Sequence, residues 1–422
     1  MKNNKLIYIY ILFLLVILKP GHSTAQWSVH HSTNKSLESI HFANANDGWV
    51  VGQLGIILHT INGGQIWTNQ NSGVNTSLTS VFFIDENNGW ICGGEWGANQ
   101  SGVILKTSNG GQSWDVQTNT QNVLEKIYFT DQDNGWVVGS LGYMMGTNNG
   151  GQTWINLTPG TNETLMDICF YDLNIGWTAG GSYDGSTYNG LILKTTNGGT
   201  SWAIAFQSSI AWIECIHFVN NLNGWAAGAN GKIFYSSDGG ITWNNQESGI
   251  TENLVDMHFI DAKKGWMVGE SNKIIYTFDG GQNWHNQMLS TDNDIFFGVH
   301  FNDPLYGWAI GTNWVGNEPE GKIIYTDNNG GDISGIGDLE NGTGILVFSN
   351  PTEGEFFVDL LKNSFGQARI DLLNITGKVQ MSKTIPPDSK RISINISEHP
   401  KGIYFIKVID NDNSWVKKVI YK

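Results

Sequence analysis

The segment Thr60-Ile-Asn-Gly-Gly-Gln-Ile-Trp67 decides the fold, because the chain repeats it at regular intervals. Each copy, which we call a box, places Thr or Ser, Asn or Asp, two Gly and a Trp at one spacing. The six complete boxes are Thr60–Trp67, Thr107–Trp114, Thr147–Trp154, Thr195–Trp202, Ser236–Trp243 and Thr277–Trp284. A seventh copy, Asp327-Asn-Asn-Gly-Gly-Asp332, lacks the Trp. Repetition at a fixed period is the signature of a repeat architecture.

A second signature, the dipeptide Gly-Trp, precedes each box. Its intervals are 41, 46, 41, 48, 41 and 42 residues, and its tryptophans are Trp49, Trp90, Trp136, Trp177, Trp225, Trp266 and Trp308. Between the signatures lie short alternating stretches, such as Ser80–Ile84 and Gly102–Lys106, bounded by Gly, Asn and Asp. These stretches are typical of strands. Four strands per repeat, seven times over, predict an all-β chain with a seven-bladed β-propeller over residues 26–332.

The composition of the box has a local explanation. We expect its Asn or Asp to accept backbone N–H groups, its glycines to adopt positive φ, and its Thr or Ser to add a hydrogen bond. The Trp then opens the next strand and buries its ring between sheets. The residues with these structural roles are Asn62, Asn109, Asn149, Asn197, Asp238 and Asp279, with Trp67, Trp114, Trp154, Trp202, Trp243 and Trp284.

The Trp missing from the seventh box has a counterpart at the start of the propeller. Trp27 lies in Gln26-Trp27-Ser28-Val29 and has no box before it. We therefore expect residues 26–31 to supply the outermost strand of the seventh blade. The first and last repeats would then share one sheet, which closes the ring without an open edge.

Composition and charge exclude several classes of protein. With 53 Gly, 18 Trp and only 14% charged residues the chain is not a coiled coil, and with 40% hydrophobic residues it is not disordered. Residues 26–334 hold 9 Lys, no Arg and 28 Asp or Glu, a net charge of −19. Such a surface disfavours nucleic acid and anionic lipid, so we expect neither as a partner.

The N-terminal segment predicts export. Lys2 and Lys5 precede the apolar run Leu6–Leu18, whose 13 residues are too few to span a bilayer as a helix. This pattern is typical of a cleavable secretory signal, which we place at residues 1–25. We expect no membrane span once the signal is removed.

The C-terminal residues predict a second, smaller domain. Residues 333–344 are Gly-rich and are interpreted as a linker. Residues 345–422 contain alternating runs with turn residues between them, which predict a small β-sandwich. The runs are Phe356–Leu360, Arg369–Leu373, Ile392–Ile396, Lys401–Tyr404 and Val416–Val419.

The boxes resemble the Asp-box repeats, S/T-x-D/N-G-G-x-T-W, of bacterial neuraminidase-repeat propellers. The added Gly-Trp and Gly-x-x-Gly elements look most like the photosystem II stability/assembly factor group. Propellers with such boxes include sialidases, xyloglucan-cleaving glycosidases and non-catalytic receptors, so the resemblance implies a fold and not an activity. Sialidases hold a substrate carboxylate with arginines, and the photosystem factors have an arginine-rich patch. This propeller contains no Arg, so neither activity is carried over.

The C-terminal domain carries a second resemblance. Asn350-Pro351, Gly377-Lys378, Gly402-Ile-Tyr404 and Lys417-Lys-Val419 follow one another as in the C-terminal sorting domain of the Bacteroidetes type IX secretion system. Ser349 departs from that pattern, which often has Pro there. The resemblance implies the type IX machinery as a partner and export through the periplasm and across the outer membrane. It also implies removal of the tail, followed by release or surface attachment.

Two residue types invite a metal or redox interpretation. His41, His217, His258 and His300 occupy equivalent positions, each before a Phe. Equivalent positions in neighbouring blades are expected roughly 10 Å apart, whereas zinc needs its ligands at about 2 Å, so we predict no metal and no cofactor. Cys169 and Cys215 share one strand parity and face the same way around the ring, so we expect them to be buried free thiols rather than a disulfide.

Nearly all length variation lies in one connection of the repeat. From Gly-Trp to the box the distances are 11, 17, 11, 18, 11, 11 and 19 residues, whereas from box to Gly-Trp they are 29 to 31. In Asp-box propellers the box joins the third and fourth strands, which implies that the variable connection joins the second and third, on the opposite face. Inserts of about 6, 7 and 8 residues enter blades two, four and seven. The candidate ligand-binding residues are Glu95, Trp96, Tyr183, Asp184, Tyr188, Trp314, Glu318 and Glu320, with Trp212 nearby.

The chain contains no H-E-x-x-H, G-x-S-x-G, Walker or C-x-x-C motif, so we assign no catalytic residue. Exposed aromatic residues concentrated on one face are typical of a contact surface. The sequence therefore favours an exported, non-enzymatic binding or adhesion module, secreted or on the outer-membrane surface, with a glycan or protein ligand. The alternative is a secreted glycoside hydrolase that uses the loop carboxylates Glu95, Asp184, Glu318 and Glu320.

Overall fold

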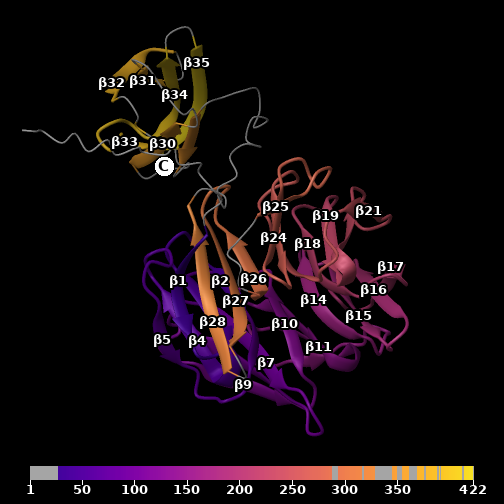
Figure 1. Cartoon of the computed structure of the whole chain (residues 1–422). Coiled ribbons are helices and arrows are strands. Elements are labelled where there is room, and N and C mark those ends of the chain that lie inside the picture. The colour runs from indigo at the N-terminus through magenta and orange to yellow at the C-terminus, as the bar shows by residue number, and fades with distance from the viewer. Residues whose placement is uncertain are drawn as a thin grey trace, which may run out of the picture. The chain divides into compact units, whose positions relative to one another are not determined.

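The computed structural model describes residues 27–287, 293–315, 318–327, 345–348, 354–360, 368–374, 377–386, 389, 391–410 and 413–421. The chain divides into two compact units, residues 1–332 and 333–422, each described here by itself (Figure 1). The predicted signal segment 1–25, the predicted linker 333–344 and the seventh box after Asp327 lie outside the described residues. Among the described residues, no helix is long and apolar enough to cross a bilayer.

The described part of the first unit forms seven four-stranded antiparallel sheets, which confirms the predicted propeller. Blades 1 to 6 each take four consecutive strands. The strands of blades 1 to 3 are β2 (Leu37–Phe42), β3 (Gly48–Gly52), β4 (Ile56–Thr60), β5 (Thr68–Asn71), β6 (Leu78–Phe83), β7 (Gly89–Glu95), β8 (Ser101–Thr107), β9 (Asp115–Thr120), β10 (Leu124–Phe129), β11 (Asn134–Gly139), β12 (Met144–Asn148) and β13 (Ile155–Asn156).

The strands of blades 4 to 6 are β14 (Thr164–Phe170), β15 (Gly176–Tyr183), β16 (Tyr188–Thr195), β17 (Ala203–Ser208), β18 (Ile213–Phe218), β19 (Gly224–Gly228), β20 (Lys232–Ser236), β21 (Asn244–Glu247), β22 (Leu254–Phe259), β23 (Gly265–Gly269), β24 (Lys273–Thr277) and β25 (His285–Gln287). Short 3-10 turns join the second and third strands of blades 1, 3 and 5. They are η1 (Gln53–Gly55), η2 (Ser140–Gly142) and η3 (Ala229–Gly231).

Blade 7 closes the ring. It consists of β26 (Ile295–Phe301), β27 (Gly307–Val315) and β28 (Glu318–Thr326), with β1 (Ser28–Thr33) as its outermost strand. β1 pairs antiparallel with β28, and Figure 1 shows the indigo β1 beside the orange β28. This is the closure that the sequence predicts for residues 26–31. Gly307 pairs with Thr326 as Gly48 pairs with Thr60, so Thr326, one residue before the predicted start of the seventh box, holds the position that Thr60 has in blade 1.

Aromatic stacking joins each blade to the next. The Trp of every Gly-Trp dipeptide lies flat on the Phe that ends the first strand of the following blade. Ring centroids are 3.5 to 4.1 Å apart in the pairs Trp49–Phe83, Trp90–Phe129, Trp136–Phe170, Trp177–Phe218, Trp225–Phe259, Trp266–Phe301 and Trp308–Phe42. The last pair links blade 7 back to blade 1, so the stacking runs around the whole ring.

The box tryptophans complete this packing. Each lies edge-on to the Phe of its own blade, for example Trp67 on Phe42 at 5.9 Å and Trp114 on Phe83 at 5.8 Å. In blade 7 Trp27 takes this position, 5.9 Å from Phe301 with an interplanar angle of 90°. Its indole Nε1 also donates to Oε1 of Gln287 at 2.8 Å. Trp27 thus replaces the Trp that the seventh box lacks.

The glycine of Gly-Trp is required by the same Phe. A Cβ on Gly48 would lie 2.4 Å from the ring of Phe42, closer than any side chain permits. The glycine three residues after the Trp meets backbone instead. A Cβ on Gly52 would lie 2.0 Å from the carbonyl oxygen of Ser36. The Gly-Trp-x-x-Gly pattern therefore reflects two close approaches within one blade.

The boxes fold as local hydrogen-bonded turns that also contact the preceding blade. In the first box, Oδ1 of Asn62 accepts the backbone N–H of Ile66 at 3.0 Å, and Oγ1 of Thr60 accepts that of Gly64 at 2.9 Å. The two box glycines have φ of 65° and 77°. The carbonyl of the first box glycine then accepts an indole N–H from the blade before. These bonds run from Trp90 to Gly150, Trp136 to Gly198, Trp177 to Gly239 and Trp225 to Gly280.

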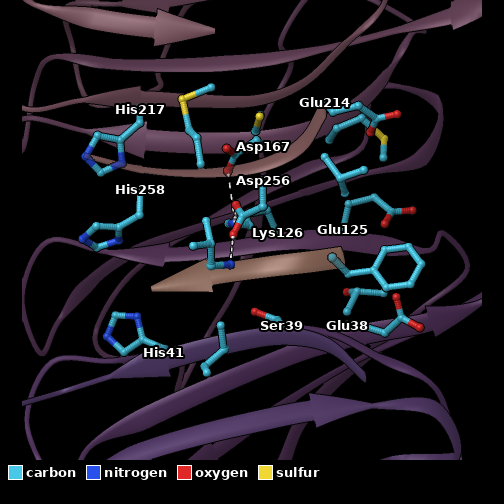
Figure 2. Close-up of a pocket in the computed structure, with 18 of the residues that line it drawn as sticks. Glu38, Ser39, His41, Glu125, Lys126, Asp167, Glu214, His217, Asp256 and His258 are labelled. Atoms are coloured by element: carbon cyan, nitrogen blue, oxygen red, sulfur yellow. Dashed lines mark hydrogen bonds and ion pairs between the residues drawn. The ribbon is translucent and has the colours of Figure 1, made fainter. Parts of the chain in front are cut away.

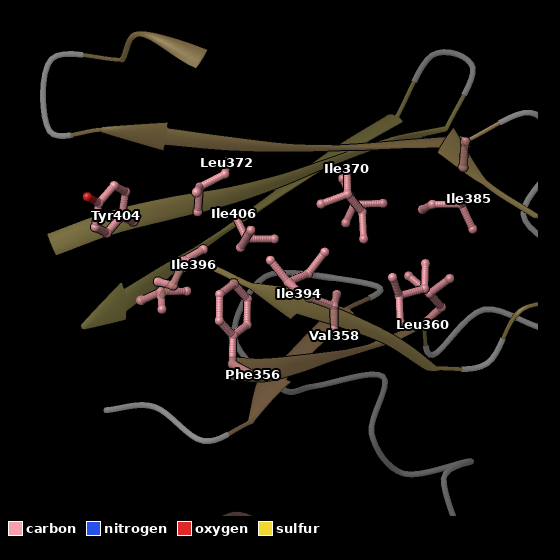
Figure 3. Close-up of a cluster of buried hydrophobic side chains, with 14 of the residues drawn as sticks. Phe356, Val358, Leu360, Ile370, Leu372, Ile385, Ile394, Ile396, Tyr404 and Ile406 are labelled. Carbon is pink, nitrogen blue, oxygen red and sulfur yellow. The ribbon is translucent and has the colours of Figure 1, made fainter. Parts of the chain in front are cut away.

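The second unit is a small β domain whose two sheets enclose one hydrophobic core (Figure 3). One sheet contains β29 (Ile345–Phe348), β30 (Glu355–Leu360) and β33 (Arg391–Asn395), and the other contains β32 (Val379–Ile385), β31 (Ala368–Asn374), β34 (Gly402–Asp410) and β35 (Asn413–Tyr421). Phe356 from one sheet and Leu372 from the other contribute to this core. The sequence analysis missed β32, because this edge strand is mostly exposed and has no apolar alternation.

Replacing Trp27 by Ala tests the closure. The variant loses the contact with Phe301 and the bond to Gln287, and we expect it to be destabilised by about 3–5 kcal/mol, the usual range for a buried Trp. Thermal or denaturant unfolding measures this. Val29→Ala is the matched control, because Val29 lies on β1, two residues after Trp27, but is 57% exposed. Equal stabilities of the Trp27 variant and the wild type would contradict closure through this strand.

Candidate functional site

The first strands of all seven blades line a central channel of about 480 Å³. Every one of these strands has the same irregularity, a register shift near its start, as between Leu37 and Ser39. At such a bulge two successive residues oppose one partner, so strict in-and-out alternation is lost. Glu38 and Ser39 consequently both line the channel.

The channel residues form three layers, which Figure 2 shows with imidazoles at one end, Lys126 in the middle and glutamates at the other end. The histidine layer, on the box side, contains His41, Phe82, Tyr128, Cys169, His217, His258 and His300. The middle layer contains Ser39, Lys126, Asp167, Cys215 and Asp256. The glutamate layer contains Glu38, Thr79, Glu125, Met166, Glu214, Val255 and Phe297.

The imidazoles of the histidine layer lie closer together than expected. Ring centroids are 5.7 Å apart for His217 and His258, 4.6 Å for His258 and His300, and 5.6 Å for His300 and His41. The expected spacing of roughly 10 Å is therefore wrong, because the first strands of neighbouring blades approach within 8 Å between Cα atoms. Burial lowers the pKa of His41 and His217 to about 4, which keeps both rings neutral at pH 7. Among the described residues, no group of three or more His, Cys, Asp or Glu is placed to hold a metal ion.

An ion-pair network spans the middle layer. Nζ of Lys126 lies 3.6 Å from Oδ1 of Asp167 and 3.7 Å from Oδ1 of Asp256 (Figure 2). Asp167 also accepts the backbone N–H of Ile216 at 2.8 Å, and Asp256 accepts that of Val299 at 2.9 Å. Burial alone would lower the pKa of Lys126, but the two carboxylates raise it above its ordinary value. The network links blades 3 to 7, so we interpret its charged groups as part of the structure that holds the blades together.

The glutamate layer holds carboxyl groups without such compensation. Burial and, after it, the charges of Glu214 and Glu38 raise the pKa of Glu125 to about 7, while a hydrogen bond with Trp96 opposes the shift. Burial likewise raises the pKa of Glu214 to about 7, against the hydrogen bond that Nε1 of Trp212 donates to its carboxylate. Both carboxyls are therefore partly protonated near neutral pH.

The variable connections surround this end of the channel. They join the second and third strands as predicted, between β7 and β8, β15 and β16, and β27 and β28. Because Leu37 pairs with Gly52, the start of the first strand and the end of the second meet at the same face. The boxes begin at the opposite edge, where Gly48 pairs with Thr60. The glutamate layer and the inserts therefore share one face, which we call the variable face.

The structure brings some of the sequence-predicted residues together and separates others. Trp96, Tyr183 and Trp314 are 58%, 46% and 50% exposed, on blades 2, 4 and 7. Tyr183 stacks on Tyr188 at 4.5 Å, and Trp212 lies edge-on to both at 6.2 and 5.8 Å.

The insert carboxylates have local contacts. Glu95 accepts the backbone N–H of Ser77 at 2.8 Å, and Asp184 accepts those of Ser186 and Thr187 at 2.9 and 2.8 Å. Glu320 lies 3.7 Å from Lys322, and Glu318 is exposed at the start of β28. The sequence analysis missed Glu38, Glu125 and Glu214. Their position directly after the first buried residue of each first strand is the signal that could have identified them, had the bulge been recognised.

Comparisons with known proteins place both units. The family model described as photosynthesis system II assembly factor YCF48 matches residues 19–118, 115–210 and 242–332, and that of a secretion system C-terminal sorting domain matches residues 346–422. A comparison with curated proteins finds no match.

Among solved structures, the chain is similar to YCF48 bound to D1 peptide, at 18% identity over 73% of this chain and 99% of that one, with a TM-score of 0.56. It is also similar to YCF48 from Cyanidioschyzon merolae, at 18% identity over 71% and 98%, with a TM-score of 0.57. It is similar as well to the GH74 xyloglucanase from Xanthomonas campestris, at 11% identity over 79% of this chain and 59% of that one, with a TM-score of 0.55. At these identities the likeness shows the fold alone.

Replacing Glu214 by Gln tests the buried carboxyl. Its pKa is about 7 in the folded protein, against an ordinary value of 4.5. Between these values the folded protein binds the additional proton, so the wild type loses stability as the pH rises through this window. Glu214→Gln should therefore be more stable than the wild type at pH 8 and show no advantage at pH 4.5. Thermal unfolding across this range measures the difference.

Glu86→Gln provides the control, because Glu86 is exposed in a turn on the box side. Glu86→Gln removes a carboxyl away from the channel, so an effect that comes only from losing one carboxylate appears in this variant as well. A constant difference for Glu214→Gln would show that its carboxyl is solvated in the folded protein.

Proposed function

Because the chain belongs to the family of the photosynthesis system II assembly factor YCF48, we propose that its propeller is an exported, non-enzymatic binding module whose ligand contacts the variable face. One observation carries this proposal: the three inserts enter the same connection in three blades, and each presents an exposed aromatic ring, Trp96, Tyr183 or Trp314. Exposed aromatic side chains gathered at one face are typical of contact surfaces.

A protein segment is the ligand class that we favour over a glycan. A relative with this fold is described as bound to a peptide, D1. The variable face of this chain offers separated aromatic rings around a channel mouth, which suits a segment that lies across several blades. The candidate carboxylates Glu95 and Asp184 already accept backbone N–H groups of their own neighbourhood, which supports a positioning role for them rather than a catalytic one.

A glycoside hydrolase is the second candidate, and it now rests on different residues. Glu125 and Glu214 have pKa values of about 7, as a general acid requires, and the fold is shared with a xyloglucanase. Assay of the chain from Gln26 onward on xyloglucan and other β-glucans tests this candidate. Hydrolysis that is lost in Glu214→Gln would replace the binding proposal with a catalytic one.

Substituting Trp96, Tyr183 and Trp314 together by Ala tests the variable face. We expect the triple variant to lose binding to ligands selected by the wild type from peptide and glycan arrays. Its melting temperature should change little, because the three rings are exposed. The matched control changes Ile61, Tyr171 and Ile241 to Ala, which are 71%, 50% and 72% exposed on the box side. Binding retained by the first variant and lost by the second would place the site on the box face.

The C-terminal sorting domain supports export to a secreted or cell-surface location. We propose that the type IX machinery recognises residues 345–422 after the signal over residues 1–25 has directed the chain to the periplasm.

A chain that ends at Asn341 tests this route. It should fold as a propeller, shown by protease resistance, yet remain in the periplasm. Fractionation of the native host, with the full chain as control, measures the location. Efficient appearance of the truncated chain outside the outer membrane would refute the sorting role.

A further inference from the structure

The connection that carries the inserts presents an apolar residue in five consecutive blades, not only in the three with inserts. Trp314 of blade 7, Leu54 of blade 1, Trp96 of blade 2, Leu141 of blade 3 and Tyr183 of blade 4 are all 46–64% exposed. Blades 5 and 6 have Asn230 and Ser271 in this connection. We call the five apolar residues the rim. The rim is an arc that covers one side of the ring.

Two rim residues hold a backbone conformation that disfavours them. Leu54 and Leu141 have φ of 55° and 56°, in the left-handed region where a β-carbon is crowded. The equivalent turn of blade 5 has Asn230 at φ 58°, a residue that tolerates this region. An exposed Leu in such a turn buries little apolar surface and has an unfavourable backbone conformation, so it does not stabilise the fold.

The rim lies on the face at which the glutamate layer of the channel opens. Glu38, Glu125 and Glu214 line this end, and Oε1 of Glu125 is buried without a hydrogen-bond partner among the described residues. Lys126 lines the channel one layer deeper, where Asp167 and Asp256 engage its ammonium group. The charge of the mouth is therefore not balanced from within the channel.

Aromatic side chains flank the same carboxyls. Trp212 donates its indole N–H to Glu214, and the indole of Trp96 lies close enough to Glu125 to affect its titration. A cation near both a carboxylate and an aromatic face gains Coulomb attraction and a cation–π contact. Basic side chains combine these two properties with an aliphatic stem that can cross an apolar rim.

We propose that the variable face binds a partner segment in which a Lys or Arg side chain is flanked by apolar residues, with the basic group entering the channel mouth and the apolar side chains contacting the rim. The proposal rests on the proposed function only for the choice of face. Charge complementarity supports this occupant, because the propeller has a net charge of −19 and no Arg.

The box face does not offer the same combination. It also presents exposed apolar residues, including Ile61, Ile66 and Ile241. However, its end of the channel is lined by His41, His217, His258 and His300, and burial lowers the pKa of all four rings. Neutral imidazoles do not attract a basic side chain. The two faces therefore provide a matched comparison within one protein.

Fluorescent octapeptides with identical Leu and Trp flanks and one central residue provide the probe. The central residue is Lys, Arg, norleucine or Glu, and polarisation is measured with the chain from Gln26 onward at pH 8. We expect the Lys and Arg peptides to bind at least tenfold more tightly than the norleucine peptide, and the Glu peptide to bind least. Glu125→Gln combined with Glu214→Gln should remove this preference and leave the norleucine peptide unaffected. Equal binding of the four peptides, no binding by any, or a preference that survives the double substitution would overturn the proposal.

Leu54→Asn combined with Leu141→Asn tests the rim separately. Asn suits the left-handed turn, so the variant should fold with an unchanged or higher melting temperature and bind all four peptides several-fold less tightly. Ile61→Asn combined with Ile241→Asn on the box face is the control and should bind as the wild type does. If an acidic peptide or a glycan binds instead, and the Trp96, Tyr183 and Trp314 triple variant loses it, the proposed function stands while this inference fails.

Discussion

The stacking of each Gly-Trp indole on the Phe of the next blade is the contact on which the propeller depends. It occurs in all seven blade-to-blade junctions, including Trp308 of the last blade on Phe42 of the first. Flat stacking fixes both the distance and the rotation between neighbouring sheets, so the number of blades follows from one repeated geometry. Each sheet buries this aromatic face only against a neighbour, which makes the ring and not the blade the unit of stability. Closure by β1 is therefore part of the fold, because it supplies the Trp27 ring that the seventh box lacks.

The same contact makes the two faces of the propeller differ in how well they tolerate changes of loop length. On the box side, indole N–H groups bond the carbonyls of the next blade's box, as Trp90 does with Gly150 at 3.1 Å. A residue inserted there would break a junction as well as a turn. On the variable face the second and third strands form hairpins that lengthen without breaking a blade-to-blade stacking pair, as the β15–β16 pairing shows by extending to Tyr183 and Tyr188, beside Trp212. Insertions thus accumulate where the scaffold does not depend on loop length.

The sequence predicts the features that repeat and misses those that depend on one local departure. Box spacing is sufficient for the seven blades and the role of Trp27, because each follows from a period or from a residue missing at one position. The face that carries the inserts follows from the length variation together with the resemblance to Asp-box propellers. The bulge after Leu37 and its equivalents leaves no signature in residue type. Without it, alternation places Glu38 away from the channel, and the glutamate layer is missed. The histidine spacing was wrong because the separation of the first strands around the channel was overestimated, and the ring centroids of His258 and His300 lie 4.6 Å apart.

The layers of the channel also explain why its two ends differ chemically. Lys126 lines the middle of the channel, and its ammonium group forms ion pairs with both Asp167 and Asp256. These carboxylates also hold backbone N–H groups of neighbouring blades, so their negative charge is useful to the scaffold and Lys126 is needed to stabilise it. The histidines avoid a charge of their own by staying neutral, because burial lowers their pKa. The glutamates at the variable face have no lysine in their layer of the channel and are not neutral at all pH values. Their charges repel one another, and hydrogen bonds from serine and indole groups only partly counteract the rise in pKa that burial causes. The histidine layer therefore carries neutral rings and the middle layer sets Lys126 against its two carboxylates, whereas the glutamate layer, which opens among the exposed aromatic side chains, has no basic side chain among its lining residues.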